Sequence, residues 1–102
     1  MLVVEEMPEF PGGELEFRRY LANSITYPTV AREEVITGTV YVTFIIDKDG
    51  SVNGTELVRG LAGGCSEEAL RVINKMPRWK PGRHNGRPAK VRYTIPIRFS
   101  LK

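Results

Sequence analysis

Cysteine and histidine, the side chains most used in redox and zinc sites, are almost missing from this sequence. The 102 residues include one Cys, Cys65, and one His, His84. A single Cys excludes an internal disulfide and any zinc site built from several cysteines. The sequence therefore offers little for redox or zinc chemistry, and we expect no metal and no cofactor.

Long hydrophobic runs are also missing. The longest nearly apolar stretch, residues 40–46, is far shorter than the roughly 20 residues that a membrane-spanning helix needs. Residues 1–4 are too few for the apolar core of a signal peptide. A length of 102 residues with 41% hydrophobic residues fits one compact domain. Taken alone, the chain is expected to be soluble, which leaves its compartment open.

Acidic residues are absent from the last third of the chain. Residues 71–102 hold ten Lys and Arg and no Asp or Glu. By contrast, residues 1–51 hold four basic and nine acidic residues, a net charge of −5, whereas residues 52–102 carry +8. An anionic partner would meet the C-terminal half. A charged face that only keeps the domain soluble explains the same pattern equally well.

The helical segments are predicted from the spacing of apolar side chains. Proline and glycine break residues 1–13 into an extended lead-in, and we assign residues 14–102 to one folded domain. One helix is predicted from Glu14 to about Asn23, and a second from Ser66, its expected N-cap, to Met76. Between them, a short helical turn is expected over residues 30–34.

Alternating side chains predict three strands. The first covers residues 37–46 and the second residues 52–59, with turn residues at 47–50 that join them into a hairpin. The last strand is predicted over residues 89–101, where apolar side chains occupy the odd positions and polar side chains most of the even ones. One face of this strand therefore packs, and the other faces water.

The order of the strands follows from the handedness of crossover connections. A crossover helix brings the third strand back parallel to the second and beside the first. The expected fold is α+β, with two helices packed on a three-stranded antiparallel sheet in the order 2-1-3. Pro96 supports an edge position for the last strand, because proline cannot donate a ladder hydrogen bond. At about 3.3 Å per residue, this strand should overhang the first by about 10 Å. A free edge can pair with another chain.

Two loops resemble ligand sites without completing them. Asp47, Asp49 and Glu56 have the spacing of a calcium loop, but Ile45 stands where the first ligand belongs, so a plain hairpin turn is favoured. Residues 60–66 resemble a phosphate-binding loop before a helix, yet they lack the lysine of a P-loop. We favour an ordinary loop there.

Catalysis and nucleic-acid binding have one candidate group each. Cys65 and His84 are the only possible nucleophile and base of a Cys/His pair, and a buried, unreactive thiol is the ordinary alternative. Trp79 lies among basic residues and could stack on single-stranded nucleic acid, or it could pin its loop to the core. Because neither candidate has a supporting group, we expect no enzyme and no nucleic-acid partner.

Five motifs spread over nearly the whole chain form a recognisable set. They are Tyr27-Pro28 followed by Ala31, residues 38–50 (GTVYVTFIIDKDG), Gly63-Gly64-Cys65 ahead of residues 67–70, residues 76–82 (MPRWKPG) and residues 93–99 (YTIPIRF). Together they resemble the C-terminal domain of TonB, the periplasmic energy transducer. The lead-in motif at residues 7–13 (MPEFPGG) resembles one branch of that family.

The resemblance implies a periplasmic domain that grips TonB-dependent transporters of the outer membrane. Its last strand would pair with their short extended segment, the TonB box. ExbB and ExbD in the inner membrane would drive the pull through an N-terminal membrane helix and a Pro-rich linker. The sequence contains neither part, so we expect an excised domain.

The expected binding residues lie on the last strand and at the Tyr-Pro motif. They are Val91, Arg92, Tyr93, Thr94, Ile95, Ile97, Arg98, Phe99, Tyr27 and Pro28. Backbone groups of the strand would form the ladder, and side chains at even positions would read the partner. Arg92 and Arg98 would pair with acidic residues of the partner, each exposed pair contributing under about 1 kcal/mol.

A second function from another class stays open. The same module could be a sensory or scaffolding periplasmic domain of another membrane protein, with peptidoglycan or a partner protein as its ligand. The sequence upstream of Met1 would separate the two functions. A free edge also permits a homodimer formed by strand exchange.

Overall fold

The computed structural model describes residues 4–101, which form three helices and five strands. In chain order these are α1 (Glu14–Ser24), α2 (Thr29–Glu33), β1 (Gly38–Ile46), β2 (Val52–Arg59), α3 (Cys65–Asn74), β3 (Gly82–His84), β4 (Arg87–Ala89) and β5 (Val91–Phe99). Within the described residues, none of the helices combines the length and the apolar character that crossing a membrane requires.

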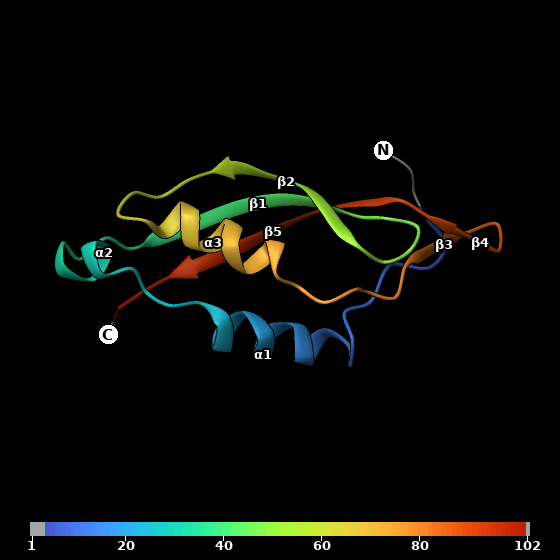
Figure 1. Cartoon of the computed structure of the whole chain (residues 1–102), viewed down its shortest axis with the longest axis horizontal. Helices are drawn as coiled ribbons and strands as arrows, with labels where there is room; N and C mark the ends of the chain where they lie inside the picture. The colour runs from blue at the N-terminus through green and yellow to red at the C-terminus, as the bar shows by residue number, and fades with distance from the viewer. Residues whose placement is uncertain (1–3, 102) are drawn as a thin grey trace.

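Three long strands form one antiparallel sheet in the order β2-β1-β5 (Figure 1). β1 and β2 form a hairpin, and α3 then carries the chain across so that β5 pairs with the other side of β1. The α+β class, the antiparallel pairing and the edge position of the last strand are confirmed. The handedness of the crossover and the position of Pro96 together predicted this topology.

The last strand is shorter than predicted. Its nine residues, Val91–Phe99, pair with all nine residues of β1, Gly38–Ile46. The predicted overhang is therefore wrong. The reason lies just before β5, where β4 pairs with β3 in a separate two-stranded sheet instead of extending β5. Asn85 and Gly86 form the turn of this small hairpin, both with positive φ, as a tight hairpin turn requires.

The number of helices also differs from the two that were predicted. The expected helical turn is the five-residue helix α2, which follows Pro28 and starts with a hydrogen bond from the Arg32 N–H to the Pro28 carbonyl, 2.9 Å. Proline favours this place because its fixed φ suits the entry to a helix. The helix ends before Val35, whose φ is 55°.

The prediction that Ser66 caps α3 is wrong. The residue ahead of the helix is Gly64, in the left-handed conformation at φ 95°, and Cys65 is already helical. The Ser66 hydroxyl instead accepts the N–H of Leu61 at 2.8 Å and donates to the Leu61 carbonyl at 3.0 Å. Ser66 therefore closes the loop between β2 and α3.

The core lies between the sheet and the two longer helices, α1 and α3 (Figure 1). Alternate residues of β1, from Val40 to Ile46, are fully buried, and α3 adds Ala69 and Ile73. α1 has no fully buried residue, and packs through the half-buried side chains of Phe17 and Leu21. In Figure 1, α1 runs along β5, so it forms one wall beside the edge strand.

The lead-in is attached to the domain by backbone bridges and by an aromatic side chain. Glu6 pairs with Arg83 and Glu9 with Lys80 in antiparallel bridges. Phe10 is 7% exposed. Its ring lies within 5.3–5.6 Å, centroid to centroid, of the rings of three neighbours: Phe17, Tyr20 and Trp79. The start of the chain therefore holds the N-terminal end of α1 against the Trp79 loop.

Candidate functional site

β5 is the edge strand of the main sheet, and its outer flank pairs with no other strand among residues 4–101. An unpaired edge exposes a row of backbone N–H and C=O groups that another extended chain can use. The predicted site residues from Val91 to Phe99 all lie on this strand. The structure therefore brings them together as one linear edge.

Side chains at the even positions of β5 are exposed, and those at most odd positions are buried. Arg92 forms an ion pair with Glu56 on β2, 3.8 Å across the open face of the sheet. The Thr94 hydroxyl lies 2.6 Å from that of Thr43. Arg98 has no ion-pair partner within the described part of the chain. Arg92 is therefore held in an ion pair within the domain, whereas Arg98 is available to pair with an acidic partner.

The odd positions of β5 form part of the core. Ile95, Ile97 and Phe99 are at most 9% exposed. Tyr93 stacks on Phe44 at 5.9 Å between ring centroids, and its hydroxyl lies 3.4 Å from the Pro8 carbonyl. Burial raises the pKa of the Tyr93 phenol, and the nearby charge of Glu14 adds to the shift. These side chains position the strand, while its backbone remains at the edge.

Tyr27 lies beside the C-terminal end of β5, although the two are far apart in the sequence. Its ring packs edge-on against Phe99 at 5.6 Å, and its hydroxyl donates to the Ile36 carbonyl. Pro28 lines a hollow of about 320 Å³ together with Glu68 and Arg71. The Tyr-Pro motif therefore lies beside the last strand in space.

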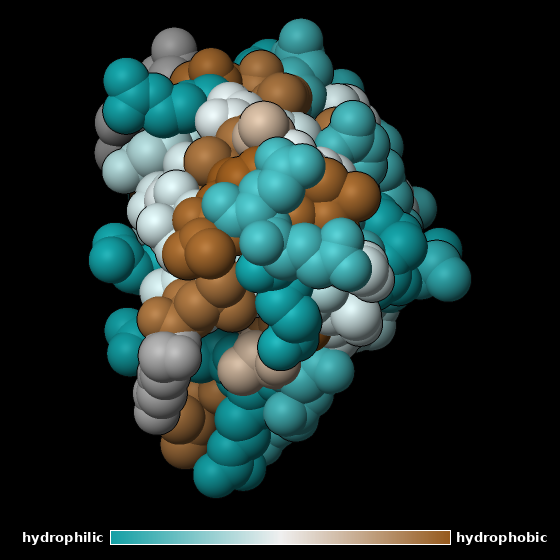
Figure 2. All heavy atoms as spheres, turned by 90° about the vertical axis from the view of Figure 1, so that its left-hand side faces the viewer, coloured by the Kyte–Doolittle hydropathy of each residue, from teal (hydrophilic) through white to brown (hydrophobic). Residues whose placement is uncertain are grey.

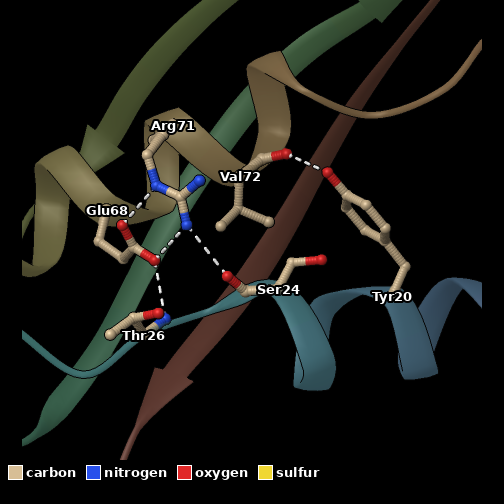
Figure 3. Close-up of polar contacts among 6 residues, drawn as sticks. All are labelled: Tyr20, Ser24, Thr26, Glu68, Arg71 and Val72. Carbon is tan, nitrogen blue, oxygen red and sulfur yellow. Dashed lines mark hydrogen bonds and ion pairs between the residues drawn. The ribbon is translucent and has the colours of Figure 1, made fainter.

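Contacts with α3 fix the position of α1 beside β5 (Figure 3). The Tyr20 hydroxyl donates to the Val72 carbonyl at 2.8 Å, and an Arg71 N–H donates to the Ser24 carbonyl at 3.0 Å. Glu68 accepts from Arg71 and from the Thr26 N–H, both at 2.7 Å. These contacts clamp the C-terminal half of α1 onto α3.

The Glu68–Arg71 pair is the part of this clamp that sequence reasoning missed. The hydrogen bonds from Arg71 lower the pKa of the Glu68 carboxyl below its usual value. In the sequence, Glu68 stands out only as an acidic residue in the first turn of a predicted helix. The signal that was available is the spacing of three residues, which places the two side chains on one helix face.

The side chains considered for other chemistry have structural roles. Cys65 is fully buried, and burial raises the pKa of its thiol, which disfavours the reactive thiolate. His84 belongs to β3, at the opposite end of the molecule from the start of α3 (Figure 1). Trp79 is 5% exposed and packs among aromatic rings, so it pins its loop and offers no surface for stacking on a base.

The carboxylates of Asp47 and Asp49 accept hydrogen bonds from residues of their own hairpin. The Asp47 carboxylate accepts the N–H of Lys48 at 2.8 Å and the amide of Asn53 at 3.0 Å. The Asp49 carboxylate accepts the N–H and the hydroxyl of Ser51. Between residues 4 and 101, no three His, Cys, Asp or Glu side chains come together in a way that could hold a metal ion.

Comparison with known proteins gives the same family as the sequence motifs. The family model described as "Gram-negative bacterial TonB protein C-terminal" matches residues 23–101. An NMR solution structure of Helicobacter pylori TonB-CTD (residues 179–285) is 29% identical with a TM-score of 0.65, covering 90% of this chain and 87% of that chain. A second one (residues 194–285) is 27% identical with a TM-score of 0.65, covering 86% and 92%. No curated protein matches. By sequence and by fold, the chain therefore belongs to the family of TonB C-terminal domains.

Proposed function

We propose that this domain docks onto outer-membrane TonB-dependent transporters by adding their TonB box to the sheet as a fourth strand beside β5. The observation that carries the proposal is the position of β5, which pairs with β1 on one side only. Strand addition derives its affinity from main-chain hydrogen bonds, which tolerate different partner sequences. Family membership supplies the identity of the partner.

The backbone groups available for pairing follow from Pro96. Along an antiparallel strand, N–H and C=O groups point alternately toward one neighbour and the other. Pro96 lies opposite Tyr41, and a proline turned toward β1 would leave a hole in that ladder. We therefore infer that the even positions, among them Arg92, Thr94 and Arg98, direct their N–H and C=O groups toward the partner. Pro96 offers only its carbonyl.

The remaining parts of the proposal rest on the family. In this scheme the domain lies in the periplasm and continues, N-terminally, into a linker and a helix in the inner membrane. ExbB and ExbD act on that helix and convert the proton motive force into a pull. The domain itself performs no catalysis and transmits the pull through its grip on the transporter.

The docking is tested by titrating the domain with synthetic TonB-box peptides from transporters of the same cell and recording backbone amide shifts by NMR. The largest shifts are expected in β5. Arg92→Pro removes one outward N–H and should weaken binding by about fivefold, the equivalent of one hydrogen bond. Arg92→Ala keeps the N–H and is the matched control.

Unchanged β5 amides at saturating peptide would contradict docking at this edge. Equal affinities of Arg92→Pro and Arg92→Ala would show that the backbone of β5 is not used. Binding of peptidoglycan fragments at another surface, with no effect of TonB-box peptides, would support the sensory or scaffolding function instead.

A further inference from the structure

We propose that side-chain specificity for the docked segment comes from a groove between α1 and β5, which receives three alternate side chains of the partner. This inference rests on the proposed function, since it assumes a guest strand on β5. It departs from the expectation that even-numbered side chains of β5 read the partner. The partner is an extended peptide with one basic and two aliphatic side chains at two-residue steps.

The groove consists of three hollows in a row, of about 300, 290 and 240 Å³. The first and second share Glu14 and Phe17, and the second and third share Leu21 and Pro96. Because each hollow has walls in common with the next, they form one continuous depression. α1 supplies one side of it and β5 the other.

The hollows repeat with the period of a strand. Along β5, the first is lined by Tyr93, the second by Ile95 and Pro96, and the third by residues 96–98. Successive hollows are thus about two residues apart, or roughly 6.6 Å. Alternate side chains of a guest strand lie on one face at the same interval. Three of them would therefore enter three hollows without distortion of the guest.

The helix wall is fixed before the guest arrives. The contacts of Tyr20 and Ser24 with α3 hold one end of α1 (Figure 3), and the lead-in residue Phe10 holds the other. A groove that is already formed loses little conformational entropy on binding. Recognition by these hollows is therefore compatible with useful affinity for a short segment.

The second and third hollows are lined mostly by aliphatic or aromatic residues, with Glu14 and Arg18 also at the second and Arg98 at the third. Phe17, Leu21 and Ile95 surround the second, and Ala22, Ile25 and Ile97 contribute to the third. Such surfaces favour valine, isoleucine or leucine, because burying these side chains removes apolar area from water. The two hollows therefore select aliphatic residues two positions apart.

The first hollow has a different chemistry. Its walls include four aromatic rings and two acidic residues, Glu9 and Glu14, and no basic residue lines it. The Glu14 carboxylate already pairs with Arg18 at 3.3 Å, so Glu9 is the main attractor for a guest cation. The rings belong to Phe10, Phe17, Trp79 and Tyr93. Because Phe10 and Trp79 are at most 7% exposed, a guest side chain would meet the half-buried rings of Phe17 and Tyr93. A cation above an aromatic face and beside a carboxylate is attracted by both. This hollow therefore selects an arginine or lysine side chain.

The probes are synthetic peptides as long as β5, which has nine residues. One reads Ser-Thr-Arg-Thr-Val-Thr-Val-Thr-Ser, and a second has the reverse order because the direction of the guest is not fixed by the groove. A control with the same composition, Ser-Thr-Thr-Arg-Val-Val-Thr-Thr-Ser, cannot place all three side chains on one face. One patterned peptide should bind about tenfold more tightly than the control.

Two pairs of variants locate the effect on the protein. Ala22→Trp fills the third hollow and should weaken the better peptide about tenfold, whereas Asn23→Trp, on the neighbouring exposed residue outside the groove, should have no effect. Glu9→Lys should weaken binding of the patterned peptide that carries Arg. The same variant should bind the patterned peptide tightly again when its Arg is replaced by Glu. Glu34→Lys, outside the groove, is the control for the change of charge.

Failure of this inference and failure of docking give different results. Two results would overturn the groove and leave docking standing, provided that TonB-box peptides shift the β5 amides. In the first, the patterned peptides bind no more tightly than the control peptide. In the second, Ala22→Trp binds the better patterned peptide as tightly as wild type does. If neither TonB-box nor patterned peptides perturb β5, the proposed function fails, and the groove inference falls with it.

Discussion

Phe10 joins the lead-in to the core, so it indicates whether residues 5–10 belong to the folded unit. The side chain is 7% exposed and touches three aromatic rings. Phe10→Ala should lower the free energy of unfolding by about 3 kcal/mol, because a buried ring leaves a cavity. Met7→Ala, at a residue 57% exposed, should change it by less than about 0.5 kcal/mol. Urea unfolding measures both, and equal small effects would show that the lead-in is only loosely attached.

Glu68 gives the clamp between α1 and α3 a defined pH dependence. Its pKa in the folded protein lies below the ordinary glutamate value of 4.5, chiefly because Arg71 donates hydrogen bonds to the carboxylate. The stabilisation is therefore complete above about pH 4.5 and is lost as the pH falls through the folded pKa. Glu68→Gln should cost about 1–2 kcal/mol at pH 7.

The difference in unfolding free energy between wild type and Glu68→Gln should shrink when both are measured at pH 3.5 or lower. Glu67→Gln, on the exposed neighbouring residue, serves as the control and should show a small difference at every pH. A wild-type advantage that is the same at pH 3.5 and pH 7 would contradict an ionised Glu68 in the clamp.

At the scale of the element, the two exposed arginines of β5 should affect association more than dissociation. Both are exposed: Arg98 is free of ion pairs among the described residues, and Arg92 forms an ion pair with Glu56. Exposed charges steer an acidic partner and are screened by salt. Arg92→Glu combined with Arg98→Glu should slow association with an acidic TonB-box peptide about tenfold at low salt.

Surface plasmon resonance at low and high salt separates the two rates. The dissociation rate should change little, and the difference in association should fade at high salt. Arg59→Glu, on the opposite edge strand β2, is the matched reversal of charge. A large rise in the dissociation rate of the β5 variant alone would mean that the arginines hold the partner directly.

The sheet was predictable because its signals are local and redundant. Alternation defined β1 and β2, the turn at residues 47–50 joined them, and crossover handedness with Pro96 placed β5 at the edge. The β3–β4 hairpin was missed although Asn85-Gly86 is a strong hairpin signal. Its strands have only three residues each and carry no alternation that a pattern could detect.

The candidate site was predictable as a strand but not as a groove. The residues of β5 follow from alternation and family resemblance. The hollows depend on the distance between α1 and β5, which is set by long-range contacts such as Tyr20 with Val72 and Phe10 with Trp79. No local pattern encodes such distances. No sequence pattern links Tyr27 to Phe99, its neighbour in space.

At the scale of the molecule, charge and apolar surface are unevenly distributed. Basic residues dominate the C-terminal half, which includes β5. The end that carries α2 exposes Val30 by 52% and Val35 by 68%, and Figure 2 shows hydrophobic surface among hydrophilic residues there. Exposed apolar patches of this kind are typical of contact surfaces. This end lies next to Tyr27-Pro28, which belong to the predicted binding residues.

The same free edge predicts competition between a second copy and the guest peptide. Two copies can pair through unoccupied edges of their sheets, and a symmetric pair formed at the same edge as the guest would use β5 of each. Sedimentation at rising protein concentration should show a homodimer that TonB-box peptide dissociates. Arg92→Pro should weaken this dimer, whereas Arg92→Ala should not. A dimer that persists at saturating peptide would place self-association on another surface.

The most direct test of the central claim is hydrogen exchange at individual amides of β5, with and without TonB-box peptide. In the free domain, the amides of Arg92, Thr94 and Arg98 should exchange quickly, and those of Tyr93 and Ile95 slowly because they already bond to β1. Bound peptide should slow the first group and leave the second unchanged. An edge that stays fast under saturating peptide, or protection confined to β2, would contradict docking by strand addition at β5.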